Sequence, residues 1–217
     1  MDLLRHIQTL ISVGEHQRLD FKFEITDARK IAKTLVAFAN TDGGRLLIGV
    51  KDNGAIAGMR SDEEYYMVES AANMYCRPEV QFKVREWSVN GKKVLEITIS
   101  RSAEKPHFAS TKEGKWLAYI RVADQNLIVN RVLLKVWKYE KTEKGVFVKF
   151  TETEKTLLEY LENHGSITLS GFTRMAKISR PKAETILIKF ILLKTIRIIF
   201  TENGTFYSIL NHQNMSN

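Results

Sequence analysis

The sequence has a single cysteine, Cys76, and no group of cysteine and histidine with the spacing of a zinc site. An intramolecular disulfide is therefore excluded, and no structural zinc site of the Cys/His type is indicated. Cys76 is expected to be a small buried apolar residue. The chain also lacks the Gly-x-x-x-x-Gly-Lys-[Ser/Thr] loop that cradles nucleotide phosphates, so nothing in it supports P-loop chemistry.

Long apolar segments are missing as well. No apolar run approaches the roughly 20 residues that a membrane span needs. The first fifteen residues have no signal-peptide pattern, and their apolar positions fit one face of an amphipathic helix. We therefore expect a cytoplasmic protein without a membrane partner.

Acidic residues are in the minority. The 217 residues include 33 Lys and Arg against 25 Asp and Glu, which gives a net charge of +8. A basic balance of this size favours an anionic partner, with DNA first and RNA second. The plainer interpretation is a soluble, mildly basic protein without such a partner.

The first 130 residues predict an α+β domain, a mixed sheet with two main helices. Apolar spacing predicts helices over 28–40 and 61–75, the first capped by Asp27. Alternating or short apolar runs predict the strands, and Asn90-Gly91 predicts a hairpin between two of them. The expected strands are 18–23, 45–50, 80–87, 92–99 and 116–122.

A basic linker is expected over 131–150, where residues 131–149 hold six Lys and Arg against two Glu. This charge fits either a solvated face or one that follows phosphates. Residues 151–212 predict three helices followed by a hairpin, which is the pattern of a winged helix-turn-helix domain. Thr151 and Glu154 have the spacing of a capping box at the first of these helices.

Three carboxylates stand at strand ends and turns between residues 15 and 58: Glu15, Asp20 and Asp52. If the fold brings them together, they could hold Mg²⁺ or Mn²⁺ for phosphodiester hydrolysis, with Lys22 beside the phosphate. The plainer interpretation is structural. Asp52 then belongs to an Asp-Asn-Gly turn, Glu15 ends a helix, and Asp20 pairs with a lysine.

Two sets of residues are candidates for phosphate contact. Four cations could line a basic groove on the sheet side, and the third helix of the C-terminal domain offers an exposed polar face. That helix also carries more apolar residues than one core-facing stripe needs, which predicts a dimer interface or packing on the first domain. No pair of residues suits bidentate base readout, so contacts should be to the backbone. The candidates are Lys22, Arg45, Lys51 and Arg121 for the sheet, and Arg180, Lys182, Thr185 and Lys189 for the helix.

Five segments occur in an order and spacing that resemble the Schlafen-type AlbA-like domain: LDFK (19–22), AFANTDGG (37–44), LLIGVKDNGAIAG (46–58), KPHF (105–108) and AYIRV (118–122). The resemblance covers roughly residues 10–130. It implies a bacterial DNA-binding domain used in transcription regulation, often followed by a winged helix. In some relatives the fold is a metal-dependent endoribonuclease. The resemblance implies that the carboxylates of those nucleases correspond to Glu15, Asp20 and Asp52 in this chain. The chain has Asp20 where the family usually has Glu.

Three functions follow from these observations. The first is a transcriptional regulator that binds DNA through phosphate contacts. The second is a metal-dependent endoribonuclease that uses the three carboxylates. The third is an interaction module in which the winged helix forms a homodimer and no nucleic acid binds.

Overall fold

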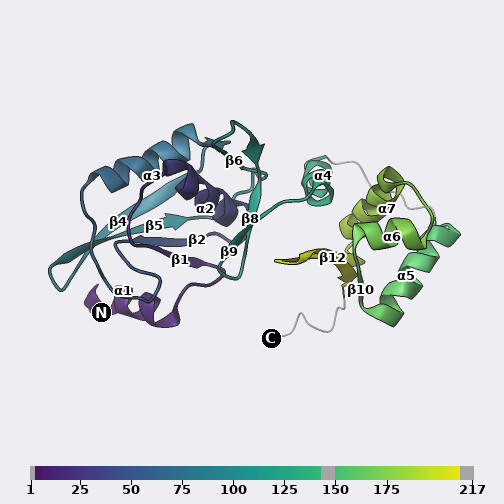
Figure 1. Cartoon of the computed structure of the whole chain (residues 1–217), viewed down its shortest axis with the longest axis horizontal. Coiled ribbons are helices and arrows are strands. Elements are labelled where there is room, and N and C mark those ends of the chain that lie inside the picture. Colours follow the sequence, from purple (N-terminus) through teal and green to yellow (C-terminus); the bar gives the residue numbers. More distant parts are fainter. Residues whose placement is uncertain (1–2, 143–149, 211–217) are drawn as a thin grey trace. The chain divides into compact units, whose positions relative to one another are not determined.

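The chain folds as two compact units, Met1–Val129 and Asn130–Asn217, called here the sheet unit and the helical unit. The computed structural model describes residues 3–142 and 150–210 (Figure 1). No helix within these two ranges is long and apolar enough to cross a membrane.

The sheet unit is built on a four-stranded sheet with the order β1-β2-β5-β4. Strands β1 (Leu19–Lys22) and β2 (Gly44–Ile48) are parallel. Strands β4 (Phe82–Val89) and β5 (Lys92–Ile99) form the hairpin expected around Asn90, and β5 runs antiparallel to β2. The expected mixed sheet of an α+β domain is therefore confirmed.

Helices cover both faces of this sheet (Figure 1). Helices α2 (Ala28–Asn40) and α3 (Glu63–Met74) pack on one face, over a buried cluster that includes residues of β2 and β5. Helix α1 (Leu3–Val13) packs on the other face over a smaller cluster. Asp27 caps α2 as predicted, because its side chain accepts the Arg29 N–H.

Short strands surround the main sheet. Strands β3 (Cys76–Arg77), β6 (Phe108–Ser110) and β7 (Trp116–Leu117) form one small sheet. Strands β8 (Tyr119–Val122) and β9 (Gln125–Ile128) form a hairpin. The single strand expected over 116–122 was wrong, because its first two residues pair with β6 and its last four pair with β9.

The helical unit contains the three helices and the hairpin expected after residue 150. The capping box between Thr151 and Glu154 is present at the first helix. One further strand, β10, joins the hairpin in a sheet with the order β10-β12-β11. The elements are α5 (Glu152–His164), β10 (Ser166–Ile167), α6 (Leu169–Met175), α7 (Arg180–Leu192), β11 (Ile196–Thr201) and β12 (Gly204–Ile209).

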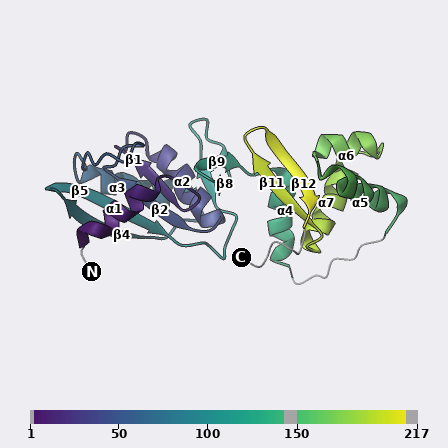
Figure 2. The same ribbon diagram turned by 90° about the horizontal axis from the view of Figure 1, so that it is seen from below.

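The basic segment before these elements contains a helix, α4 (Arg131–Glu140), which packs against α7 (Figure 2). Its residues Val132 and Val136 are buried in the same cluster as Leu187 of α7. Asn130 fixes the start of α4, because its Oδ1 accepts the Leu133 N–H at 2.9 Å. The segment is thus part of the helical unit up to Glu140, while residues 143–149 of the expected linker lie outside the described residues.

The packing of α4 corrects the interpretation of the apolar side chains on α7. Ile186, Leu187, Ile188 and Phe190 are at most 4% exposed within the helical unit. Because α4 covers α7 on a side that three helices alone would leave open, these four side chains are buried, while Leu193 at the end of α7 stays 45% exposed. The packing of α4 therefore accounts for these four residues, and a dimer interface on α7 stays a prediction.

We expect Val136→Asp to lower the free energy of unfolding of the helical unit by about 3 kcal/mol or more, because it places an unpaired carboxylate among buried apolar groups. The matched control is Tyr139→Asp on the same helix, where the side chain is 52% exposed. The control should change stability by about 0.5 kcal/mol at most. Urea unfolding followed by circular dichroism measures both, and equal effects would contradict the packing of α4.

Candidate nucleic-acid interface

Two of the three candidate carboxylates lie together at β1, the terminal strand of the four-stranded sheet. The Phe21 N–H points away from β2, and Glu15 Oε1 accepts it at 2.7 Å. An edge strand presents backbone donors that need partners. Glu15 therefore supplies one missing hydrogen bond of the sheet edge, which is a structural task.

Asp20, the second carboxylate, is buried and is held by two cations. Arg121 Nη2 of β8 donates to its Oδ1 at 3.0 Å, and Lys22 Nζ lies 2.9 Å from its Oδ2. The Arg121 side chain is 1% exposed and also donates to the Leu19 carbonyl and to Asn126 Oδ1. This ion pair ties β1 to β8, two strands about a hundred residues apart in the chain.

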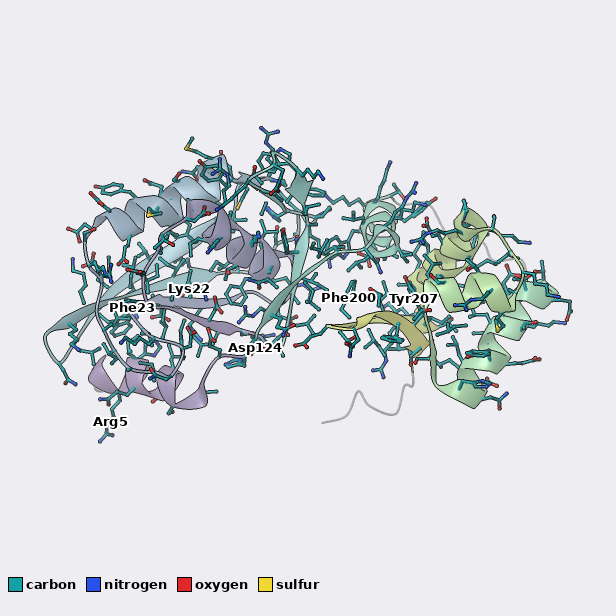
Figure 3. The ribbon with its side chains drawn as sticks, viewed as in Figure 1. Arg5, Lys22, Phe23, Asp124, Phe200 and Tyr207 are labelled. Atoms are coloured by element: carbon teal, nitrogen blue, oxygen red, sulfur yellow. The ribbon has the colours of Figure 1, made fainter. Side chains whose placement is uncertain are left out.

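The position of Arg121 corrects its predicted role. A guanidinium that is buried on a carboxylate cannot contact a phosphate at the surface, so Arg121 is a structural residue. Lys22, labelled in Figure 3, is also engaged, because its ammonium donates to the Phe21 carbonyl at 2.6 Å and pairs with Asp20. The proximity of Lys22 to Asp20 follows from the two-residue period of a strand, which puts both side chains on the same face of β1.

The Glu15 and Asp20 carboxyl groups interact. Burial raises the pKa of Glu15, and the neighbouring Asp20 carboxylate raises it further. The hydrogen bond from Phe21 N–H and the Lys22 ammonium oppose this shift without cancelling it. Glu15 therefore keeps its proton to a higher pH than an exposed glutamate.

The donor set does not fit the Mg²⁺ or Mn²⁺ ion that the family resemblance implies. Asp52 lies in an exposed turn after β2, and within residues 3–142 and 150–210 no three His, Cys, Asp or Glu side chains converge on one point. Each Asp20 oxygen already faces a cation, and a divalent ion placed there would be repelled by both. The described part of the chain thus gathers two carboxylates and two cations in place of three metal ligands.

The other two sheet cations lie elsewhere. Arg45 pairs in register with Leu19, so it is on the opposite face of the sheet from Asp20, and its Nε lies 3.0 Å from Glu96 Oε1. Lys51 is exposed in the turn after β2, with its ammonium 5.3 Å from the centre of the Phe23 ring. The four sheet cations therefore do not line one groove, and that prediction was wrong.

The candidate residues of α7 are accessible. Arg180, Lys182 and Thr185 are exposed, and Lys189 is half-buried. They lie on the turns of α7 that its buried apolar residues leave open to solvent. The arrangement gives α7 a polar stripe with three cations and one hydroxyl.

A buried carboxylate that the sequence did not indicate anchors the start of this stripe. Glu184 Oε2 accepts from Lys135 Nζ of α4 at 2.8 Å, and Arg180 Nε lies 3.5 Å from its Oε1. Arg131 Nε lies 3.8 Å from Oε2. The hydrogen bond from Lys135 and the nearby cations lower the pKa of Glu184. Three cations around one carboxylate leave a local charge of +2, and the four-residue spacing of Arg180 and Glu184 was the available signal.

Tyr207 closes the same cluster from β12 (labelled in Figure 3). Its hydroxyl accepts from Asn130 Nδ2 at 3.3 Å, and burial raises its pKa to about 12. The residue is neutral at any physiological pH. It therefore joins the start of α4 to the hairpin without adding charge to the surface.

We expect Arg121→Met to lower the free energy of unfolding by about 3–5 kcal/mol, because it leaves the buried Asp20 carboxylate without its main partner. Arg18→Met, at an exposed position one residue before β1, is the matched control and should cost little. Adding Asp20→Asn to Arg121→Met should recover part of the loss, because no charge then stays buried. Chemical denaturation tests this, and equal stability of the two single variants would show that the ion pair is not structural.

A pH dependence should follow from the raised pKa of Glu15. The folded protein holds this proton more tightly than the unfolded chain, so Glu15 contributes stability below its ordinary pKa of 4.5, and the contribution is lost as the pH rises through the higher folded value. The amide of Glu15→Gln keeps an acceptor for the Phe21 N–H and carries no charge. Relative to the parent chain, the variant should therefore gain stability as the pH rises above 4.5, and the gain should be small because solvent screens a part-buried group.

Thermal unfolding at several pH values measures this difference. Glu159→Gln, at an exposed position of α5, removes one carboxyl group far from Asp20 in the chain and is the control. If the Glu15→Gln difference does not change with pH, the interaction of the two carboxyl groups is contradicted.

Comparisons with solved structures find distant likenesses. The DIP2311 protein from Corynebacterium diphtheriae is 18% identical with a TM-score of 0.48, and the match covers 96% of this chain and 38% of that one. The N-terminal domain of a RecG-related protein from Nitrosomonas europaea is 20% identical with a TM-score of 0.41, over 60% of this chain and 96% of that one. This chain thus spans well under half the length of the first of these proteins.

No curated protein matches the chain. The model of one family, described as Schlafen, AlbA_2, matches residues 15–130, which is more than half of the 217 residues. The match begins at Glu15 and ends after β9, so it includes the whole four-stranded sheet with α2, α3 and the Asp20–Arg121 pair. The chain therefore belongs to the Schlafen AlbA_2 family.

Proposed function

We propose that this protein binds nucleic acid, DNA in the first place, and acts as a transcriptional regulator. The helical unit is the DNA-binding domain, a winged helix that follows a Schlafen AlbA-like domain. The observation that carries the proposal is the surface of α7, where most apolar side chains are buried and Arg180, Lys182, Thr185 and Lys189 remain for contact.

The order of elements supports the winged-helix assignment. Helices α5, α6 and α7 are followed by the β11–β12 hairpin, and β10 between α5 and α6 pairs with β12. In helix-turn-helix domains the last of these helices enters the major groove, so α7 is the groove-reading helix of this proposal. The hairpin then takes the place of the wing.

The chemistry of the stripe favours contacts to phosphate over contacts to bases. Lysine is a point charge that suits phosphate oxygens, and α7 carries no Asn or Gln for bidentate contact with adenine. Phosphate contacts set the register of a protein on DNA and carry no sequence information. We therefore propose modest sequence specificity and an affinity that falls with salt.

The two other interpretations have less support. A metal-dependent endoribonuclease would need Glu15, Asp20 and Asp52 to converge as acceptors, whereas Asp20 is held by Arg121 and Lys22. A homodimer through α7 would need an apolar surface, whereas most apolar side chains of α7 are buried in the cluster that includes α4. DNA binding is the function that we put forward.

The test measures binding of a labelled DNA duplex by fluorescence anisotropy between about 50 and about 200 mM salt. The logarithm of the binding constant should fall linearly with the logarithm of salt concentration, since bound cations are released from the DNA. Lys182→Gln with Lys189→Gln should weaken binding and reduce that slope by about 2, one for each lost phosphate contact.

The matched control is Lys30→Gln with Lys155→Gln, which removes the same charge from exposed positions of α2 and α5. If the two double variants have the same slope, the loss reflects net charge alone and α7 is not the binding helix. If the parent chain binds with no dependence on salt, phosphate contacts do not drive its binding.

A further inference from the structure

A second cationic surface lies in the sheet unit, on the face of the sheet that α1 covers in part. Under α1 this face is apolar, with Leu47, Trp87 and Val94 in one buried cluster. Farther along the same strands it becomes polar. Arg45 of β2 pairs in register with Thr98 of β5, and Thr98 pairs with Lys83 of β4. The next pair on this face is Glu96 with Arg85.

These residues surround a cavity of about 310 Å³, lined by His6, Arg45, Lys83, Val84, Arg85, Glu96 and Thr98. The volume is at the lower end of the range for small-molecule pockets and is several times that of one phosphate group. Three permanent cations and one carboxylate line it, so its charge is +2. The cavity therefore suits a small anion with an organic part attached.

The carboxylate in the cavity is already occupied. Glu96 is 5% exposed, and it accepts from Trp87 Nε1 at 2.8 Å. Arg45 Nε lies 3.0 Å from one of its oxygens and His6 Nε2 lies 3.1 Å from the other. Glu96 is thus a positioning residue, which holds the Arg45 guanidinium and the His6 ring at the rim of the cavity.

The two cations of β4 are not neutralised by carboxylates. Within the part of the chain that the structure describes, neither Lys83 nor Arg85 has an ion pair. The Arg85 guanidinium lies over the Trp87 ring, 5.2 Å from its centre. Lys83 and Arg85 share a face with Arg45 across β5, and the single carboxylate among these three cations, Glu96, leaves an excess positive charge that an anionic ligand would offset.

We propose that this cavity binds the phosphate group of a nucleotide, with Arg45, Lys83 and Arg85 on the phosphate oxygens. The hydroxyl of Thr98, which also lines the cavity, donates a further hydrogen bond to the same group. The phosphate belongs either to a free nucleotide or to a nucleic-acid strand, and the chemistry of recognition is the same.

The size of the cavity and the His6 ring distinguish a nucleotide from inorganic phosphate. His6 stacks on Trp87 with ring centres 4.8 Å apart, and its side chain is 38% exposed. An aromatic ring beside a cationic pocket offers a stacking surface to a base. The site is in the sheet unit and uses none of the α7 residues, so it does not depend on the function proposed for the helical unit.

The experiment is calorimetric titration of the full chain with AMP, with adenosine and with a short single-stranded oligonucleotide. AMP should bind, and adenosine should not, because it lacks the phosphate. In Lys83→Gln with Arg85→Gln we expect the dissociation constant of AMP, of the oligonucleotide or of both to rise about tenfold or more, since two charge-assisted contacts are lost.

The matched control is Lys92→Gln with Arg77→Gln. Lys92 is on the same hairpin, and Arg77 stacks on Trp116 at 4.2 Å much as Arg85 stacks on Trp87. The control should bind like the parent chain, and thermal unfolding should show that both variants are folded. If the Lys83 and Arg85 variant loses affinity for the oligonucleotide alone, a nucleic-acid strand is the source of the phosphate.

Two outcomes would overturn the proposal. One is that neither AMP nor the oligonucleotide binds to the parent chain. The other is that the Lys83 and Arg85 variant binds both as the control does. The Lys182 and Lys189 variant of α7 should keep AMP binding, so a failure of the DNA-binding proposal would be visible as a separate result.

Discussion

The ion pair between Asp20 and Arg121 is the constraint on which the rest of the sheet unit depends. It joins β1, the edge of the main sheet, to β8, which belongs to a separate hairpin. A buried carboxylate and a buried guanidinium are each costly without the other, so the two strands are held in one arrangement. The same pair removes Asp20 from metal chemistry, because both of its oxygens face cations.

Buried carboxylates organise cations at three places in this protein. Asp20 holds Arg121 and Lys22, Glu96 holds Arg45, and Glu184 holds Lys135 and Arg180. In each case one negative charge in a poorly solvated position orders cations that would otherwise be mobile. At Glu96 and Glu184 further cations remain nearby, and the excess positive charge reaches the surface. Positive charge on this protein is therefore gathered in particular places, which is what recognition of a phosphate requires.

Much of the secondary structure followed from local patterns. The Asp27 cap, the Asn90-Gly91 hairpin and the capping box at Thr151 depend on residues within a few positions of one another, and all three are present. The strand expected over 116–122 was wrong because its two halves pair with partners that no local pattern reveals. The predicted phosphate contact of Arg121 was wrong for the same reason, because the residues that bury its side chain come from β1 and β9.

By itself the sequence determined the fold class, the positions of most helices and strands and the basic character of the protein. It also showed the resemblance of roughly residues 10–130 to the Schlafen-type AlbA-like domain. The tertiary structure decided which charges are available. Arg45 and Arg121 look alike as basic residues near strands, yet one lines an open cavity and the other is buried on Asp20. The physical reason is that the availability of a charge depends on its neighbours in space, and these come from segments far apart in the chain.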